Sequence, residues 1–153
     1  MNHLEYMSLA LKEAHKAFKI GETPIGAVLV YEGKVIAKAH NKREKKQDVS
    51  CHAEILAIKR ACKKLKSWRL EGCSIYVTLE PCIMCAGAMI QSRIQNCYYG
   101  ATNKRFGSHT GDINLFSGNY NHKVNVVGGI LEEECSNLIS NFFKEVRNER
   151  GCK

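Results

Sequence analysis

The strongest constraint on the fold of this chain is a pair of cysteines and a distant histidine, which together offer three metal-binding side chains. Cys82 and Cys85 stand three residues apart after Pro81, and His52 lies well upstream. Cysteines at i and i+3 lie on one face of a helix, and Pro81 fits the turn from a strand into that helix. His52 also begins a predicted helix. We therefore expect two helix starts to converge on one ion, where their partial positive charge favours thiolates.

Three side chains are one ligand short of a closed tetrahedral zinc site, and the fourth position is then open to water. Glu54, two residues after His52, offers a carboxylate that can carry the proton of that water. Residues two apart on an ideal helix point about 200° away from each other. Either His52 lies at the cap before the helix, or Glu54 reaches back, and the sequence leaves both arrangements open. Three ligands and a carboxylate together predict an enzyme that performs hydrolysis.

Each part of this motif has a simpler interpretation. A single Cys-x-x-Cys pair can be a redox pair or half of a structural zinc site, and Cys51 is a possible fourth ligand that would close the site. Glu54 can be an ordinary acidic residue at a helix start. The joint pattern favours the catalytic interpretation. Most of the scattered cysteines are predicted to be small core residues, namely Cys51, Cys62, Cys73, Cys97, Cys135 and Cys152.

Hydrophobic patterns along the chain alternate between helical and extended periods. The predicted elements are a helix at 4–18, strands at 25–31 and 35–40, a helix at 52–65, a strand at 74–79, a helix at 82–93, strands at 96–100 and 124–127, and a helix at 131–150. This order predicts a three-layer α/β protein with some parallel strand pairing. The polar segment 102–121 is the longest irregular stretch and a candidate functional loop.

Composition narrows the class of protein further. A chain of 153 residues that is 44% hydrophobic fits one globular domain. No export signal and no bilayer-length apolar run occur, so we expect a reduced, cytoplasmic chain that does not enter a membrane. The formal net charge of +8 predicts a polyanionic partner such as nucleic acid. Basic clusters lie at 42–46 and 59–69, although a solvated lysine-rich surface would give the same pattern.

The residues H-A-E at 52–54, followed by P-C-I-M-C at 81–85, are similar to the signature of the zinc nucleoside and nucleobase deaminases. Within that superfamily, which includes the cytidine and deoxycytidylate deaminases, the chain resembles the bacterial tRNA-specific adenosine deaminases over nearly its whole length. The resemblance is carried by 23–28, 40–41, 52–55, 76–90, 121–122, 133–135 and 142–143.

This resemblance implies a fold and an activity. The fold is the α/β/α cytidine-deaminase-like fold, with a mixed five-stranded sheet, in a single deaminase domain over 1–153 that forms a homodimer. The activity is hydrolytic conversion of adenosine to inosine at the wobble position of a tRNA anticodon, with the anticodon stem-loop as partner. The zinc ion, one per subunit, would be held by His52, Cys82 and Cys85. Glu54 would shuttle the proton while hydroxide attacks carbon six of the purine and ammonia leaves.

The resemblance also implies contacts to the base. The predicted substrate-binding residues are Asn41, Val28, Ala53 and Asn103. An amide offers both a donor and an acceptor to a base edge, and an apolar wall fits a flat heterocycle. Without the resemblance, Val28 would be interpreted as a core strand residue and Asn41 as a turn residue.

The chain departs from this family after Gly100. Asn103 stands where the family usually carries an aspartate, and Phe106–Gly111 stands where it carries small residues. A carboxylate accepts from a ribose hydroxyl more strongly than an amide does, so we expect weaker discrimination between RNA and DNA. Phe106 and His109 are either stacking surfaces for unstacked bases or packing residues of a variant loop.

Two other functions fit part of the pattern. A guanine or cytosine deaminase acting on a free base shares the zinc chemistry, but a small neutral base needs no cationic surface. The residues that argue against it are Phe142, Phe143, Lys144, Arg147 and Arg150. A zinc-stabilised RNA-binding module without catalysis would have no use for Glu54.

Overall fold

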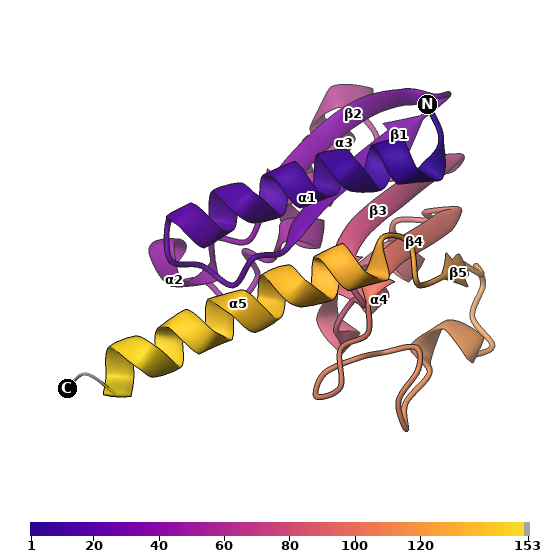
Figure 1. Cartoon of the computed structure of the whole chain (residues 1–153). Helices are drawn as coiled ribbons and strands as arrows, with labels where there is room; N and C mark the ends of the chain where they lie inside the picture. The colour runs from indigo at the N-terminus through magenta and orange to yellow at the C-terminus, as the bar shows by residue number, and fades with distance from the viewer. Residues whose placement is uncertain (152–153) are drawn as a thin grey trace.

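The computed structural model describes residues 1–151, with side chains through residue 149, and a mixed five-stranded sheet organises them. The strands lie in the order β2-β1-β3-β4-β5. The elements in chain order are α1 (His3–Lys19), β1 (Gly26–Tyr31), β2 (Lys34–His40), α2 (Arg43–Lys46), α3 (Ala53–Leu65), β3 (Cys73–Leu79), α4 (Ile83–Gln91), β4 (Asn96–Ala101), a 3-10 turn (Leu115–Ser117), β5 (Asn125–Val127) and α5 (Glu132–Gly151), as Figure 1 shows. The predicted mixed sheet is confirmed.

Turn chemistry and connection length set the strand directions. Glu32 and Gly33 both have positive φ, 51° and 77°, which suits the tight turn of the β1–β2 hairpin. β1 also pairs antiparallel with β3. The pairs β3–β4 and β4–β5 are parallel, and parallel neighbours need a crossover, which α4 supplies between β3 and β4. The first turns of α3 and α4 therefore both lie near strand ends.

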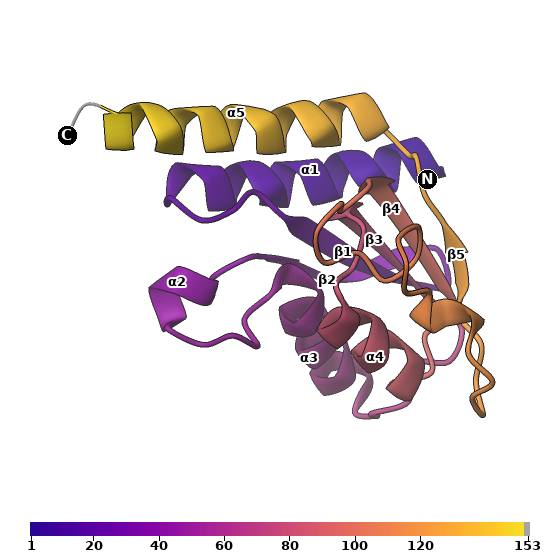
Figure 2. The same ribbon diagram turned by 90° about the horizontal axis from the view of Figure 1, so that it is seen from below.

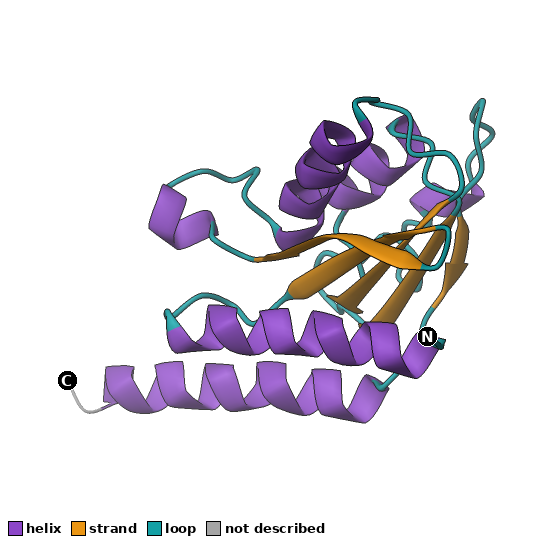
Figure 3. Ribbon diagram, turned by 90° about the horizontal axis from the view of Figure 1, so that it is seen from above, coloured by secondary structure: helices purple, strands orange, loops and turns teal. Residues whose placement is uncertain are grey.

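The helices form two layers on opposite faces of the sheet (Figures 2 and 3). α3 and α4 cover one face, and their core includes Leu29, Ile75 and Val77. α1 and α5 lie side by side on the other face, where Met7 and Val30 are buried. Each large apolar side chain buried in this way contributes about 1.5–3 kcal/mol of transfer free energy. Successive β1 side chains alternate between the layers, as the period of two requires.

Local signals explain where the helices begin and end. Asn2 and Glu5 form a capping box at the start of α1, which satisfies two backbone donors. Gly21, with φ of 79°, follows the end of the same helix. α5 runs along α1 (Figures 1 and 2), and Phe142 meets Phe18 edge to face at 5.6 Å. The predicted helices and strands are confirmed, with ends shifted by up to two residues.

The described residues bear on three further predictions. The segment predicted as a basic loop contains the short helix α2, because the buried Glu22 carboxylate accepts the backbone N–H groups of Glu44 and Lys45 at 3.1 and 2.7 Å. Four of the scattered cysteines are buried, Cys62 is half-buried, and Cys152 lies outside the described residues. None of the described helices combines the length and apolar character that crossing a membrane requires.

Candidate metal and catalytic site

The structure brings His52, Cys82 and Cys85 together. Their ligand atoms all lie within 4.8 Å of one another. His52 Nδ1 is 3.6 Å from Cys82 Sγ and 3.5 Å from Cys85 Sγ. Among the described side chains, these three form the one group that could hold a metal ion. Cys51, the possible fourth ligand, does not belong to it.

Both helix starts converge as the sequence predicts. His52 is the N-cap of α3 and Cys82 is the N-cap of α4, and both have extended backbone, with φ of −74° and ψ of 152° and 174°. Because His52 lies before the helix rather than inside it, its side chain and that of Glu54 do not follow the 100° helical step. The sequence left two arrangements open, and the structure adopts the one with histidine at the cap.

The three donor atoms fit a tetrahedral zinc ion. With Zn–N of about 2.0–2.1 Å and Zn–S of about 2.3 Å, the tetrahedral edge between N and S is about 3.5 Å. The hydrogen bond from Cys85, together with the contact with His52, outweighs burial and lowers the pKa of the Cys82 thiol to about 4. Cys82 and burial raise the pKa of Cys85. The contacts within the group therefore favour the thiolate form of Cys82, which is the form that binds metal.

Glu54 is buried beside this group. Its side chain is 3% exposed, and its Oε1 atom has no hydrogen-bond partner among the described residues. Burial raises the pKa of Glu54 to about 7. A carboxyl group with a pKa near neutrality can both accept and return a proton at the pH of the cell.

Asn41 lies in the turn between β2 and α2 and is nearly buried. Its Nδ2 donates to the carbonyl of Thr23 at 3.3 Å, and its Oδ1 accepts from Arg43 N at 3.2 Å. These bonds match the turn role expected without the resemblance. One amide hydrogen and one lone pair of oxygen remain beyond these two bonds, so the side chain retains capacity for a base.

Two other predicted pocket residues, Ala53 and Val28, lie on opposite faces of the sheet. Ala53 is fully buried in the first turn of α3, within the core that holds Cys85. Val28 is fully buried on the opposite face of the sheet, under α1, so the structure places it away from the metal-binding group. Ile25 packs against the site-side core, and its carbonyl accepts from Asn41 N at 3.0 Å. The alternation of side chains along a strand could have placed Ile25 on the α3 and α4 side of the sheet, because it shares a face with Ala27 and Leu29.

The loop after β4 lies against the turn that leads into α4 and carries Pro81 and Cys82. Gly107 forms a β-bridge with Cys82, and Ser108 Oγ donates to the carbonyl of Pro81 at 2.6 Å. Asn103 Oδ1 accepts from Phe106 N at 3.1 Å and so stabilises the first turn of the loop. His109 bonds Tyr99 Oη through Nδ1 at 2.8 Å and is a packing residue, whereas Phe106 is 68% exposed.

The two basic clusters lie at different distances from the site. Lys42, at the start of the cluster, donates its backbone N–H to the carbonyl of Cys51 at 3.0 Å, and Cys51 precedes His52, so the cluster at 42–46 begins next to the site. The second cluster begins on the last turns of α3, a helix about 20 Å long whose other end carries His52. Near the C-terminus, Phe142 is buried against α1 and Phe143 is 47% exposed. The side chain of Arg150 lies outside the described ones.

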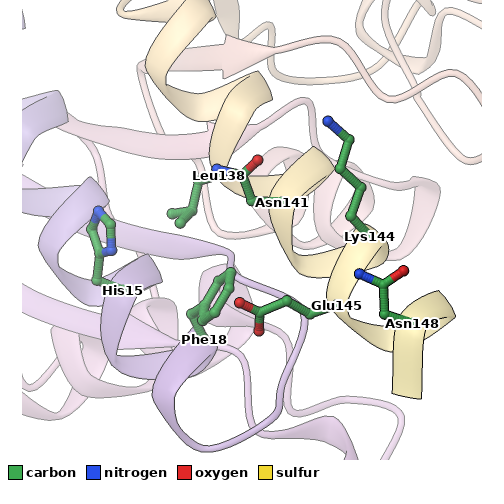
Figure 4. Close-up of a pocket in the computed structure, with 7 residues that line it drawn as sticks. All are labelled: His15, Phe18, Leu138, Asn141, Lys144, Glu145 and Asn148. Atoms are coloured by element: carbon green, nitrogen blue, oxygen red, sulfur yellow. The ribbon is translucent and has the colours of Figure 1, made fainter. Parts of the chain in front are cut away.

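A cavity of about 470 Å³ lies elsewhere, between α1 and α5 (Figure 4). Its lining residues are His15, Phe18, Leu138, Asn141, Lys144, Glu145 and Asn148. These two helices cover the face of the sheet opposite α3 and α4 (Figure 2). The cavity therefore takes no part in the metal-binding group.

Comparisons with known proteins match this arrangement. A family model described as MafB19-like deaminase matches residues 1–147. The tRNA-specific adenosine deaminase of Bacillus subtilis (strain 168) is 51% identical over 146 residues, which are 95% of this chain and 91% of that protein. A solved structure from studies of A-to-I editing by tRNA:A34 deaminases at the wobble position of transfer RNA has a TM-score of 0.85 and 43% identity, and the match covers 88% of this chain and 98% of that one.

A guanine deaminase from Bacillus subtilis is similar over a shorter part. Its structure has a TM-score of 0.64 and 37% identity, and the match covers 67% of this chain and 66% of that one. The segment shared with the guanine deaminase is thus smaller than the segment shared with the two proteins above.

Proposed function

Because this chain belongs to the family of tRNA-specific adenosine deaminases, we propose that it converts adenosine to inosine at the wobble position of a tRNA anticodon by zinc-dependent hydrolysis. The observation that carries the proposal is the buried, unpartnered Glu54 Oε1 beside the group of His52, Cys82 and Cys85. Leaving a buried polar atom without a hydrogen bond costs about 1–3 kcal/mol. A fold that retains this cost favours a chemical role for the carboxylate.

The residues of the site divide between holding an ion and moving a proton. His52 Nδ1 and the sulfurs of Cys82 and Cys85 would hold the ion through a neutral imidazole and two thiolates, and the two thiolate charges would balance the divalent charge. Zinc bound there would act as a Lewis acid and lower the pKa of a water molecule to about 7. Glu54 Oε1 accepts a proton from the attacking water and returns it to the purine. The C6–N bond then breaks and ammonia leaves, so adenosine and water give inosine and ammonia.

The base is held by residues on the same side of the sheet. Ile25 and Ala53 supply apolar surface, and the remaining hydrogen-bonding capacity of Asn41 is directed at the base edge. Val28 is left out of this pocket because it lies under α1. Asn103 contacts the ribose-phosphate backbone through its Nδ2 group, since its Oδ1 atom is occupied by Phe106 N.

The partner is the anticodon stem-loop of a tRNA. Exposed basic residues of α2 follow Lys42, whose backbone N–H bonds the carbonyl of Cys51 next to His52, and they would meet the phosphates of nucleotides that flank the target base. The wider proposal is a single deaminase domain over 1–153, with one zinc ion per subunit, acting as a homodimer in the cytoplasm. The common sheet that both helical layers cover supports the single domain.

A free-base guanine deaminase is the second candidate, because 37% identity extends over two thirds of this chain. The higher identity to the tRNA-specific enzyme and the net charge of +8 favour the tRNA substrate. The two candidates differ in the product that each forms.

The proposal is tested by incubating the zinc-loaded protein with total tRNA and analysing the nucleosides for inosine, with free guanine and cytosine as parallel substrates. We expect inosine in tRNA and no change in the free bases. Glu54→Ala should abolish inosine formation while tRNA affinity and bound zinc are retained. Deamination of guanine without inosine formation would establish the second candidate, and activity in Glu54→Ala would remove the proton-transfer role.

A further inference from the structure

A second buried carboxylate, Glu80, lies between β3 and the cysteine-bearing turn and has no part in the chemistry described above. Its residue is 1% exposed. Its two oxygens accept four hydrogen bonds, all from the loop after β4. The donors are Asn103 N at 3.2 Å, His109 N at 2.9 Å, Thr110 N at 3.0 Å and Thr110 Oγ1 at 2.7 Å.

These bonds have to compensate for a large cost. A buried carboxylate is expensive unless it is paired or fully hydrogen-bonded. In the described part of the chain, none of the ion pairs involves Glu80. The loop alone therefore satisfies this carboxylate, and the carboxylate links the two ends of the loop, at Asn103 and Thr110, to one point.

Backbone packing leaves the loop little freedom around that point. A Cβ atom at Gly107 would overlap Glu80 Oε2 and the carbonyl of Asn103, so only glycine fits there. Gly107 also forms the β-bridge with Cys82, and Ser108 bonds the carbonyl of Pro81. The loop is thus built onto the same turn that presents the first cysteine of the metal-binding group.

The opposite side of the loop faces solvent. Lys104, Arg105 and Phe106 are exposed, and they lie between the two ends that Glu80 holds. Two cations and an aromatic ring are the side chains that contact phosphates and unstacked bases of single-stranded RNA. Loosening the two ends would spread these three side chains over many orientations.

We propose that Glu80 is a positioning residue that holds the 103–110 loop in the shape that grips the nucleotides flanking the target base. The inference rests on the proposed function for its substrate. Glu80 acts through the loop and touches neither the reacting atoms nor the metal-binding side chains. It therefore controls how well the RNA is bound, whereas Glu54 controls how fast the bound base reacts.

The test is Glu80→Gln, with Glu13→Gln as a matched control. The glutamine side chain would turn an amide N–H₂ group toward backbone donors and so lose part of the four bonds. Glu13 is also a buried carboxylate, but it bonds Lys16 and His40 and makes no contact with the loop. With an RNA hairpin as substrate, we expect Glu80→Gln to raise KM about tenfold and to change kcat less than about threefold. Zinc content should be unchanged, and Glu13→Gln should leave KM unchanged.

Trypsin cleavage after Lys104 and Arg105 gives an independent readout of the loop. It should be faster in Glu80→Gln than in the wild type and Glu13→Gln, because a loosened loop opens more often into the extended backbone that a protease cleaves. This readout needs no activity, so it tests the holding of the loop even if the wild type forms no inosine, a result that would remove the proposed function alone. Inosine formation with unchanged KM and unchanged proteolysis in Glu80→Gln would overturn the inference.

If Glu80→Gln fails to fold or loses zinc, the Thr110→Val variant tests whether Glu80 positions the loop. This variant removes the Oγ1 bond and keeps the carboxylate and the backbone bonds. We expect a KM about threefold to fivefold higher, with zinc retained and with faster cleavage at Lys104 and Arg105. A KM and a cleavage rate equal to those of the wild type would contradict the role of Glu80.

Discussion

At the scale of single residues, Glu54 combines a stability cost with a proposed chemical role. Its carboxylate is buried, and Oε1 has no hydrogen-bond partner among the described residues. Glu54→Gln keeps the volume and removes the charge. We expect kcat to fall by about 10²–10⁴, with zinc content and RNA affinity unchanged and with a melting temperature equal to or above that of the wild type. Kinetics and calorimetry of the zinc-loaded variant check this, and a kcat within a factor of about ten of the wild type, or a large loss of stability, would contradict it.

Asn103 is the residue at which we expect substrate choice to differ from that of its relatives. Its Oδ1 atom caps the loop turn through Phe106 N, and an aspartate would keep this bond while adding negative charge. We therefore predict that Asn103→Asp raises the ratio of deamination of an RNA hairpin to deamination of the matched DNA hairpin. The ratio is measured for both proteins under the same salt conditions. Equal ratios would show that the amide does not set the preference.

The residues differ in how far sequence could identify them. The grouping of His52, Cys82 and Cys85 could be predicted because residue type and the Cys-x-x-Cys spacing indicate metal binding. Val28 was assigned to the pocket from the resemblance, but strand alternation turns it toward α1, whereas Ile25 packs against the core that includes Ala53 and Cys85. The role of Glu80 could not be predicted, because it depends on contacts with a loop far along the chain.

At the scale of elements, α2 brings a basic surface to the site. Its basic side chains are exposed, and buried Glu22 fixes its backbone. We predict that Lys45→Glu with Lys46→Glu weakens RNA binding and lowers the slope of log affinity against log salt, by about one unit per lost phosphate contact. Titrations at several salt concentrations measure the slope.

The matched control for α2 is the double variant Lys63→Glu with Lys64→Glu. Both lysines are exposed near the end of α3 that lies away from His52. Their loss should change the slope less than the loss of the α2 lysines. If the α3 variant has the larger effect, the RNA docks on the second basic cluster and not on α2.

The elements themselves were predicted because each has a local cause. Helix periods, the Glu32-Gly33 turn and the glycine after α1 are all readable within a few residues. α2 was missed because a four-residue helix has no hydrophobic period, and its stability comes from Glu22, which lies before β1. The order of the strands within the sheet likewise depends on pairings between distant segments.

At the scale of the whole molecule, two apolar cores enclose the sheet, one on each face. The site lies at the ends of the strands and joins α3 to α4. We predict that chelating the zinc abolishes activity and lowers the melting temperature, since a ligand that binds only the folded state stabilises it. The metal-free chain should retain its helical circular dichroism, and added zinc should restore activity. Complete unfolding on chelation would show that the ion is structural.

X-ray absorption at the zinc edge tests most directly whether three side chains hold the ion and leave one position open. The account predicts two sulfur neighbours at about 2.3 Å and two lighter neighbours at about 2.0–2.1 Å, of which one is the imidazole. Cys51→Ser should leave this spectrum unchanged. A third sulfur that disappears in Cys51→Ser would show a site closed by four protein ligands and would contradict the hydrolytic mechanism.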